Sequence, residues 1–158
     1  MKPFKIQHIE DLEFYTNENI DYTTLDPKKV SMSMSNELQL AANSADMFMT
    51  IEYKYKETST LLLKQKARFT FRGDFKDCQS NEKDKTNEEW KNNLKELSLE
   101  LMIITLGTLR GIIYIKTRNN SFLSQHLLPI FQKDFLQQGI DEGIDNTTNK
   151  ETQEKHQG

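Results

Sequence analysis

The chain has 158 residues, of which 35% are hydrophobic and 28% are charged, and its formal net charge is -3. This length fits one domain of ordinary size, so a second independent core is not expected. The mildly acidic balance argues against a general nucleic-acid binder. A single cysteine, Cys78, excludes an internal disulfide framework and a multi-thiolate zinc site.

The first residues, MKPFKIQHIEDLEF, carry charges where the apolar region of a secretory signal would lie. The longest uncharged run in the most apolar part of the chain is LMIITLGTL. It is much shorter than the roughly 20 residues that a membrane span needs. Together with the single thiol, these patterns predict a cytoplasmic protein that is not inserted in a membrane.

The N-terminal half of the chain alternates between apolar and polar residues, which predicts strands. Segment 4–14, FKIQHIEDLEF, alternates with a phase shift that a bulge near His8 or Ile9 would explain. Three cleaner segments follow, with inward-facing sets Val30, Met32, Met34, Leu38 and Leu40, then Met47, Met49, Ile51, Tyr53 and Tyr55, then Leu61, Leu63, Ala67, Phe69 and Phe71. Short polar connections at 42–45 and 57–60 suit consecutive antiparallel hairpins.

The connection between the first and second predicted strands is too long for a hairpin. It carries Tyr15, Ile20, Tyr22 and Leu25 before Pro27. Apolar residues in a crossover segment need a surface to cover.

A long helix is predicted from Thr86 to Thr117. Thr86 and Glu89 form a capping box at its start. Its apolar residues fall on two nearly opposite stripes, and a domain of this length can cover only one of them with its own sheet. The second stripe therefore predicts contact with another subunit. The expected interface residues are Leu101, Ile104, Gly107, Thr108, Gly111, Ile112 and Ile115, with the two glycines allowing close approach of another backbone.

A second, short helix with aromatic residues is expected after Pro129, and a polar tail follows it. The fold class is thus α+β, a four-stranded antiparallel sheet followed by one long and one short helix that assembles through the long helix. Residues 1–138 form the single domain. Residues 139–158 form an acidic tail that lacks a periodic apolar set and is expected to be disordered.

The sequence offers no convergent set of catalytic groups. His8, His126 and His156 stand in a strand, a loop and the tail, without metal-ligand spacing. Nucleotide-binding and nucleophile-elbow motifs do not occur. We therefore expect no enzyme activity, no metal and no cofactor.

The outward faces of the third and fourth predicted strands are rich in lysine and arginine. The residues are Lys54, Lys56, Lys64, Lys66, Arg68 and Arg72, with Glu52 among them. Such a face can protect a sheet against edge pairing, or it can bind phosphate or an acidic protein. No aromatic residues alternate with these cations to stack bases, which makes nucleic acid the weaker of these binding hypotheses.

The order of elements is similar to that of the SecB family of protein-export chaperones. FKIQHIEDLEF resembles the family's first strand, where an F-x-I-Q-R-I start precedes an acidic residue and an aromatic. LGTLRGIIYIKTRNNSFLSQHLLPIFQKDFLQQG resembles the end of the family's long helix, its loop with a Leu-x-Pro element and its closing aromatic helix. The resemblance covers roughly residues 4–140.

The resemblance implies a homotetramer, built as a dimer of dimers, that keeps unfolded polypeptides soluble without ATP for protein export. It implies that clients bind as extended apolar segments between the crossover, the sheet and the last helix. The matching client-binding positions are Phe14, Tyr15, Ile20, Tyr22, Leu25, Leu128, Ile130, Phe131 and Phe135.

The sequence also departs from the family. SecB proteins present an acidic sheet face to the export motor SecA, and only Asp11 occupies a matching acidic position here. Binding of a SecA-type export motor is therefore in question. Two alternatives remain open, a SecB-like chaperone dedicated to one client such as an antitoxin, and a non-catalytic module that binds nucleic acid or an acidic protein through the basic face.

Overall fold

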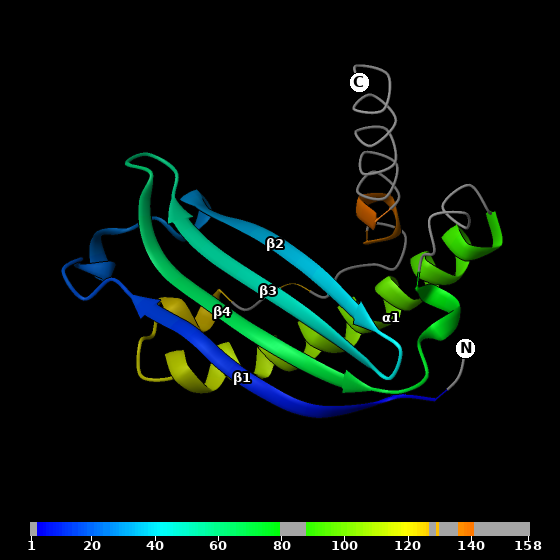
Figure 1. The fold of residues 1–158 in the computed structure, drawn as a ribbon. Coiled ribbons are helices and arrows are strands. Elements are labelled where there is room, and N and C mark those ends of the chain that lie inside the picture. Colours follow the sequence, from blue (N-terminus) through cyan, green and yellow to red (C-terminus); the bar gives the residue numbers. More distant parts are fainter. Residues whose placement is uncertain (1–2, 80–87, 127–128, 130–135, 141–158) are drawn as a thin grey trace, which may run out of the picture.

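The structure is a computed structural model that describes residues 3–79, 88–126, 129 and 136–140. It contains strands β1 (Lys5–Thr16), β2 (Val30–Ala41), β3 (Ser44–Tyr55) and β4 (Thr60–Arg72), followed by the helix α1 (Glu88–Thr117). Short 3-10 turns occur at Tyr22–Thr24, Pro27–Lys29, Lys76–Cys78 and Leu123–Gln125, and residues 136–140 are helical. The predicted α+β class is confirmed (Figure 1).

The four strands form one antiparallel sheet in the order β1-β4-β3-β2. Tight hairpins join β2 to β3 and β3 to β4, as predicted, whereas β1 pairs with β4. The long segment after β1 crosses the end of the sheet, so β1 and β2 become its two edge strands (Figure 1).

The strand β1 contains two irregularities in its pairing with β4. One lies between Ile6 and His8, which confirms the predicted bulge, and a second lies between Asp11 and Glu13. Side chains directly opposite each other in an antiparallel pair point to the same face. Ile9 stands opposite the buried Phe69, so the bulges bring apolar residues of β1 back to the helix side.

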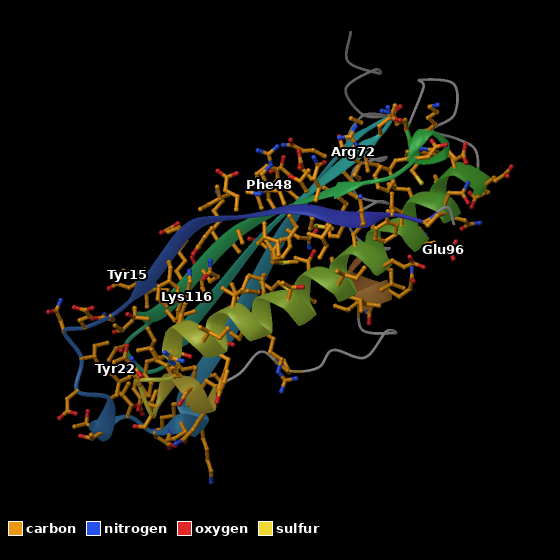
Figure 2. All side chains as sticks on the ribbon, turned by 90° about the horizontal axis from the view of Figure 1, so that it is seen from below. Tyr15, Tyr22, Phe48, Arg72, Glu96 and Lys116 are labelled. Atoms are coloured by element: carbon orange, nitrogen blue, oxygen red, sulfur yellow. The ribbon has the colours of Figure 1, made fainter. Side chains whose placement is uncertain are left out.

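The core lies between α1 and the inner face of β3 and β4. Alternate residues of both strands are buried there, as the period-two pattern predicted, and they include Met47, Met49, Ile51, Tyr53, Ala67, Phe69 and Phe71. From α1, the buried residues include Leu97, Leu99, Leu101, Met102, Leu106, Leu109 and Ile113. Figure 2 shows α1 lying along one side of the sheet.

Three sequence expectations concern the boundaries of the elements. A register irregularity between Tyr53 and Lys54 buries Leu62 in place of the expected Leu61. The described part of α1 starts at Glu88, so the capping residue Thr86 lies outside the described residues. The final helix runs to the buried Ile140, two residues past the expected domain end at 138, and the rest of the predicted tail also lies outside them.

The helix α1 is long and apolar enough to cross a membrane by length and composition. Its most apolar 18-residue window has a mean hydropathy of 1.5. Core helices of soluble proteins meet the same criteria, and one flank of α1 lies in the core described above. These properties are therefore weak grounds for a membrane span.

Replacing Leu109 with alanine tests the contact between α1 and the sheet. Leu109 is fully buried, so Leu109→Ala should lower the free energy of unfolding by about 2–5 kcal/mol in urea titrations. Leu12→Ala removes the same atoms from a side chain that is 41% exposed, and it should cost much less. Equal losses in the two variants would contradict this placement of the core.

Candidate functional site

The crossover between β1 and β2 is held in place by specific contacts to the turn after α1. The Tyr22 hydroxyl donates a hydrogen bond to the Asn17 carbonyl at 2.9 Å. The Tyr22 ring stands 5.5 Å from the Phe122 ring, centroid to centroid. The ring nitrogens of His126 lie 2.7 Å from the Phe122 carbonyl oxygen and 3.3 Å from that of Pro27. The crossover and the turn after α1 thus form one packed unit.

Four of the predicted client-binding residues pack on the core between the sheet and α1. Phe14, Ile20, Tyr22 and Leu25 are half-buried against the core, and we call them the crossover cluster. Tyr15 is separated from them, because its register partner Lys64 lies on the opposite face and its own side chain is 41% exposed. The remaining predicted residues, Leu128, Ile130, Phe131 and Phe135, lie outside the described residues.

A second apolar row lies on the edge strand β2. Val30, Met32, Met34, Leu38 and Leu40 form this β2 inner row. They face the core side but stay half-exposed, whereas the matching residues of β3 are buried. The alternation of the sequence had placed these side chains inward. It could not show that β2 is an edge strand, which is the reason that they remain accessible.

The side of α1 turned away from the sheet carries exposed apolar residues. Ile103, Ile104, Gly107, Gly111, Tyr114 and Ile115 make up this α1 stripe, with Tyr114 50% and Ile115 63% exposed. A side-chain carbon built on Gly107 or Gly111 meets no atom within 4 Å, apart from those of the adjoining helix. The surface of α1 therefore has free space beside the two glycines.

The predicted interface set changes in part. Leu101 is fully buried in the core of its own chain, because the helix turns it toward the sheet. Ile112 is half-buried and packs on the same core. Thr108 is also half-buried, and its hydroxyl donates to the Ile104 carbonyl at 2.9 Å. Ile103 and Tyr114, which the prediction omitted, complete the exposed surface.

Asp11 belongs to a polar cluster that joins β1 to the end of α1. The Lys116 ammonium donates hydrogen bonds to the Asp11 carboxylate and, at 3.1 Å, to the Gln65 side-chain oxygen. The buried Gln65 amide donates to Asp11 at 2.7 Å, and the Phe14 ring lies 4.4 Å from the Lys116 nitrogen. The bond from Lys116 lowers the pKa of Asp11, against the raising effect of desolvation. Asp11 therefore faces α1 and does not lie on the outer sheet face, where motor docking was expected.

Carboxylates pair with three of the six cations that the sequence predicted for the outer face of the sheet. Lys64 pairs with Glu13 of β1 at 3.0 Å, and Lys54 pairs with Glu52 at 2.8 Å. Arg68 is held by Asp46 at 2.7 Å and Glu10 at 3.7 Å, and it covers the Phe48 ring. The hydrogen bonds from Arg68 and Thr70 lower the pKa of Asp46. Figure 2 shows Phe48 and Arg72 on the side of the sheet opposite α1.

The described residues hold no group of three or more His, Cys, Asp or Glu side chains placed to bind a metal ion. The Cys78 thiol is buried, and burial raises its pKa.

Comparison with known proteins places this arrangement among SecB-like folds. One similar solved structure is the Mycobacterium tuberculosis SecB-like chaperone Rv1957, in complex with a ChAD peptide from the HigA1 antitoxin. The two chains share 10% sequence identity with a TM-score of 0.55, over 82% of this chain and 88% of that one. No family model and no curated protein matches the sequence. The likeness therefore shows a SecB-like fold.

The polar cluster of Asp11 predicts a pH-dependent stability. A lowered folded-state pKa means that the Asp11 carboxylate stabilises the fold above its ordinary pKa of 3.8, and that this contribution is lost as the pH falls through the lowered value. Asp11→Asn should be less stable than the wild type at pH 7, by about 1 kcal/mol or less because the carboxylate is half-exposed. Urea unfolding measured from pH 7 downward should show the difference fading in acid. A difference independent of pH would contradict a role for the charge.

Proposed function

We propose that this protein is an ATP-independent holdase chaperone that binds extended apolar segments of unfolded client proteins. The observation that carries the proposal is the set of half-exposed apolar side chains along the helix side of the sheet. The crossover cluster and the β2 inner row both pack on the core while keeping part of their surface open.

The chemistry of these surfaces suits clients of varied sequence. Met32 and Met34 carry flexible, polarizable side chains that adapt to different partners. Tyr22 presents an aromatic ring whose orientation is fixed by its hydrogen bond and by Phe122. Several weak apolar contacts along one client chain add up through effective concentration, which requires no nucleotide.

The outer sheet face favours a dedicated client over general export. The SecB resemblance implies an acidic face for docking of a SecA-type motor. Here Glu10, Glu13 and Asp46 are engaged with the cations of β4. The similar chaperone of Mycobacterium tuberculosis was solved with an antitoxin peptide. We therefore place an antitoxin-like polypeptide ahead of exported preproteins as the client of this chain.

The same features make a nucleic-acid module the weaker alternative. Binding to phosphates needs unpaired cations, since counterion release drives the association. Lys54, Lys64 and Arg68 are each already paired with a carboxylate. These pairs therefore lower the net positive charge that the outer face offers to a nucleic acid or to an acidic protein.

We also propose that the protein assembles as a homotetramer, a dimer of dimers, through the α1 stripe. Ile104 and Ile115 expose apolar surface that a partner helix can cover. Gly107 and Gly111 lie one turn apart between them and leave room for close approach of a second backbone. A helix that is apolar on both sides needs a cover on both sides.

A client-aggregation assay tests the holdase proposal. The wild-type protein, at a stoichiometric ratio and without nucleotide, should delay aggregation of an unfolded apolar client followed by light scattering. The double variant Met32→Gln/Met34→Gln should need several-fold more protein for the same delay, because it replaces apolar contact area with amides.

The matched control is Ser33→Gln/Ser35→Gln, on the outer face of the same strand. It should protect the client as well as the wild type does. No delay by the wild-type protein, or equal loss in both double variants, would contradict the proposed surface.

The solution mass tests the assembly. A side-chain carbon added at the exposed Gly107 meets no atom within 4 Å outside the adjoining helix, so Gly107→Leu should fold. It should associate at least about tenfold more weakly, which light scattering coupled to size exclusion would detect. Gly107→Ala keeps the site small and should retain the wild-type mass. A monomeric wild-type protein, or an unchanged mass for Gly107→Leu, would rule out this interface.

A further inference from the structure

The α1 stripe has a charged residue beyond each of its ends. Glu100 and Arg118 are both exposed, and neither forms an ion pair with any residue that the structure describes. About five turns of helix separate the two positions, so both side chains start from one line along the helix axis. Arg118 directly follows Thr117, the last residue of α1. The stripe is therefore bounded by an anion on one side and by a cation on the other.

The stripe is also symmetric about its middle. Leu109 lies midway between Glu100 and Arg118, about two and a half turns from each, which places it on the opposite side of the helix, where it is fully buried. Taken as pairs equally distant from Leu109, the outward residues are Gly107 with Gly111, Ile104 with Tyr114, Ile103 with Ile115, and Glu100 with Arg118. Reversing the direction of the helix thus returns the same spacing of glycines and apolar residues, and it exchanges the two charges.

A surface with this symmetry can match a second copy of itself. In a two-fold contact, residue i of one subunit touches residue j of its partner, and j touches i. If two α1 helices pack antiparallel with the axis at the level of Leu109, Glu100 meets Arg118 of the partner subunit, and the same pair forms again at the other end. Parallel packing would instead place each of these charges opposite its own kind, which is repulsive.

The length of the contact sets the angle between the helices. Glu100 and Arg118 each lie roughly 13 Å from the midpoint along the helix axis. A crossing angle of about 20° keeps the two axes close over that length, whereas a steep crossing would separate the charges. In the shallow arrangement the glycines meet at the centre, and Ile104 lies across from Ile115 of the partner subunit. Both of these isoleucines are exposed in the single chain.

We infer that α1 packs antiparallel on the α1 of a second copy of this chain, with two ion pairs between Glu100 and Arg118 of the partner subunit. The inference rests on the assembly proposed above and adds the polarity and the register of its helices. The apolar middle of the stripe supplies the contact area. The ion pairs favour the antiparallel orientation, and they oppose a slip along the helix because a slip would draw the charges apart.

Charge reversal tests the ion pairs. Glu100→Arg and Arg118→Glu each bring like charges together at both ends, so each should weaken association about tenfold at low ionic strength, measured by light scattering coupled to size exclusion over a dilution series. Both positions are exposed, so the variants should fold. The double variant Glu100→Arg/Arg118→Glu restores opposite charges and should associate within about twofold of the wild type.

A matched control makes the same change of charge away from α1. Glu18→Arg alters an exposed residue of the crossover and should associate as the wild type does. Added salt screens exposed charges, so the difference between Glu100→Arg and the wild type should shrink at high ionic strength.

Cross-linking tests the polarity. The variants Ile104→Cys and Ile115→Cys would be mixed, allowed to exchange subunits and treated with a short reagent that joins two thiols. The mixture should give a cross-linked dimer, because antiparallel packing brings the two positions together. Each variant alone should give little, since its two thiols lie at opposite ends of the contact. The wild-type protein is the blank, because its Cys78 is buried.

The outcomes separate the polarity from the assembly. A cross-linked dimer from Ile104→Cys alone indicates parallel helices, which overturns the inference and leaves association through α1 intact. Unchanged association in both single reversals, or a double variant that associates no better than they do, also overturns it. A monomeric wild-type protein overturns the ion pairs and the proposed assembly together.

Discussion

The packing of α1 on β3 and β4 is the contact on which the rest of the structure depends. The helix covers the two central strands, whose apolar residues are buried almost completely. One helix cannot also cover the edge strand β2, and it cannot cover its own far side. The half-exposed β2 inner row and the exposed α1 stripe both follow from this single geometry. The surfaces proposed for clients and for subunits are thus consequences of a core that is narrower than the sheet.

The ends of that contact are fixed by polar interactions. At the C-terminal end of α1, Lys116 bridges Asp11 and Gln65, which places β1 and β4 under the last turn of the helix. At the other end, the Trp90 indole nitrogen donates to the Cys78 carbonyl at 3.1 Å and ties α1 to the turn after β4. Apolar packing alone tolerates sliding of a helix along a sheet, whereas these directional bonds specify one position.

Much of the fold could be predicted from the sequence, because period-two alternation and a long apolar helix are local patterns. The four strands, the first β1 bulge and the extent of α1 depend on neighbouring residues alone. The pairing of β1 with β4 is a non-local choice that no short pattern records. The salt bridges of Lys64 and Arg68 with β1 follow from that choice, and so does the inward position of Asp11. The outer face was expected to be basic because the short sequence patterns did not reveal the carboxylates that β1 brings to it.

The candidate site, too, could be predicted from the sequence only in part. The packing of Tyr22 and Leu25 on the core could be predicted, because apolar residues in a long connection need a surface to cover. Leu101 was assigned to the wrong side of α1, since two apolar stripes on one helix do not reveal which of them meets the sheet. The buried Tyr53 hydroxyl has no hydrogen-bond partner in the part of the chain that the structure describes, and no sequence pattern indicated this, because a tyrosine in an alternating strand resembles any other core residue.

The place of β1 also has a kinetic consequence. The strands β2, β3 and β4 are joined by short hairpins, and such local contacts form rapidly. Asp11 and Gln65, which join β1 to β4, are 54 residues apart, so their contact closes a long loop. The three-stranded meander is therefore expected to form first and β1 to dock onto it late. In the folding order of the chain, the first strand in sequence is among the last to arrive.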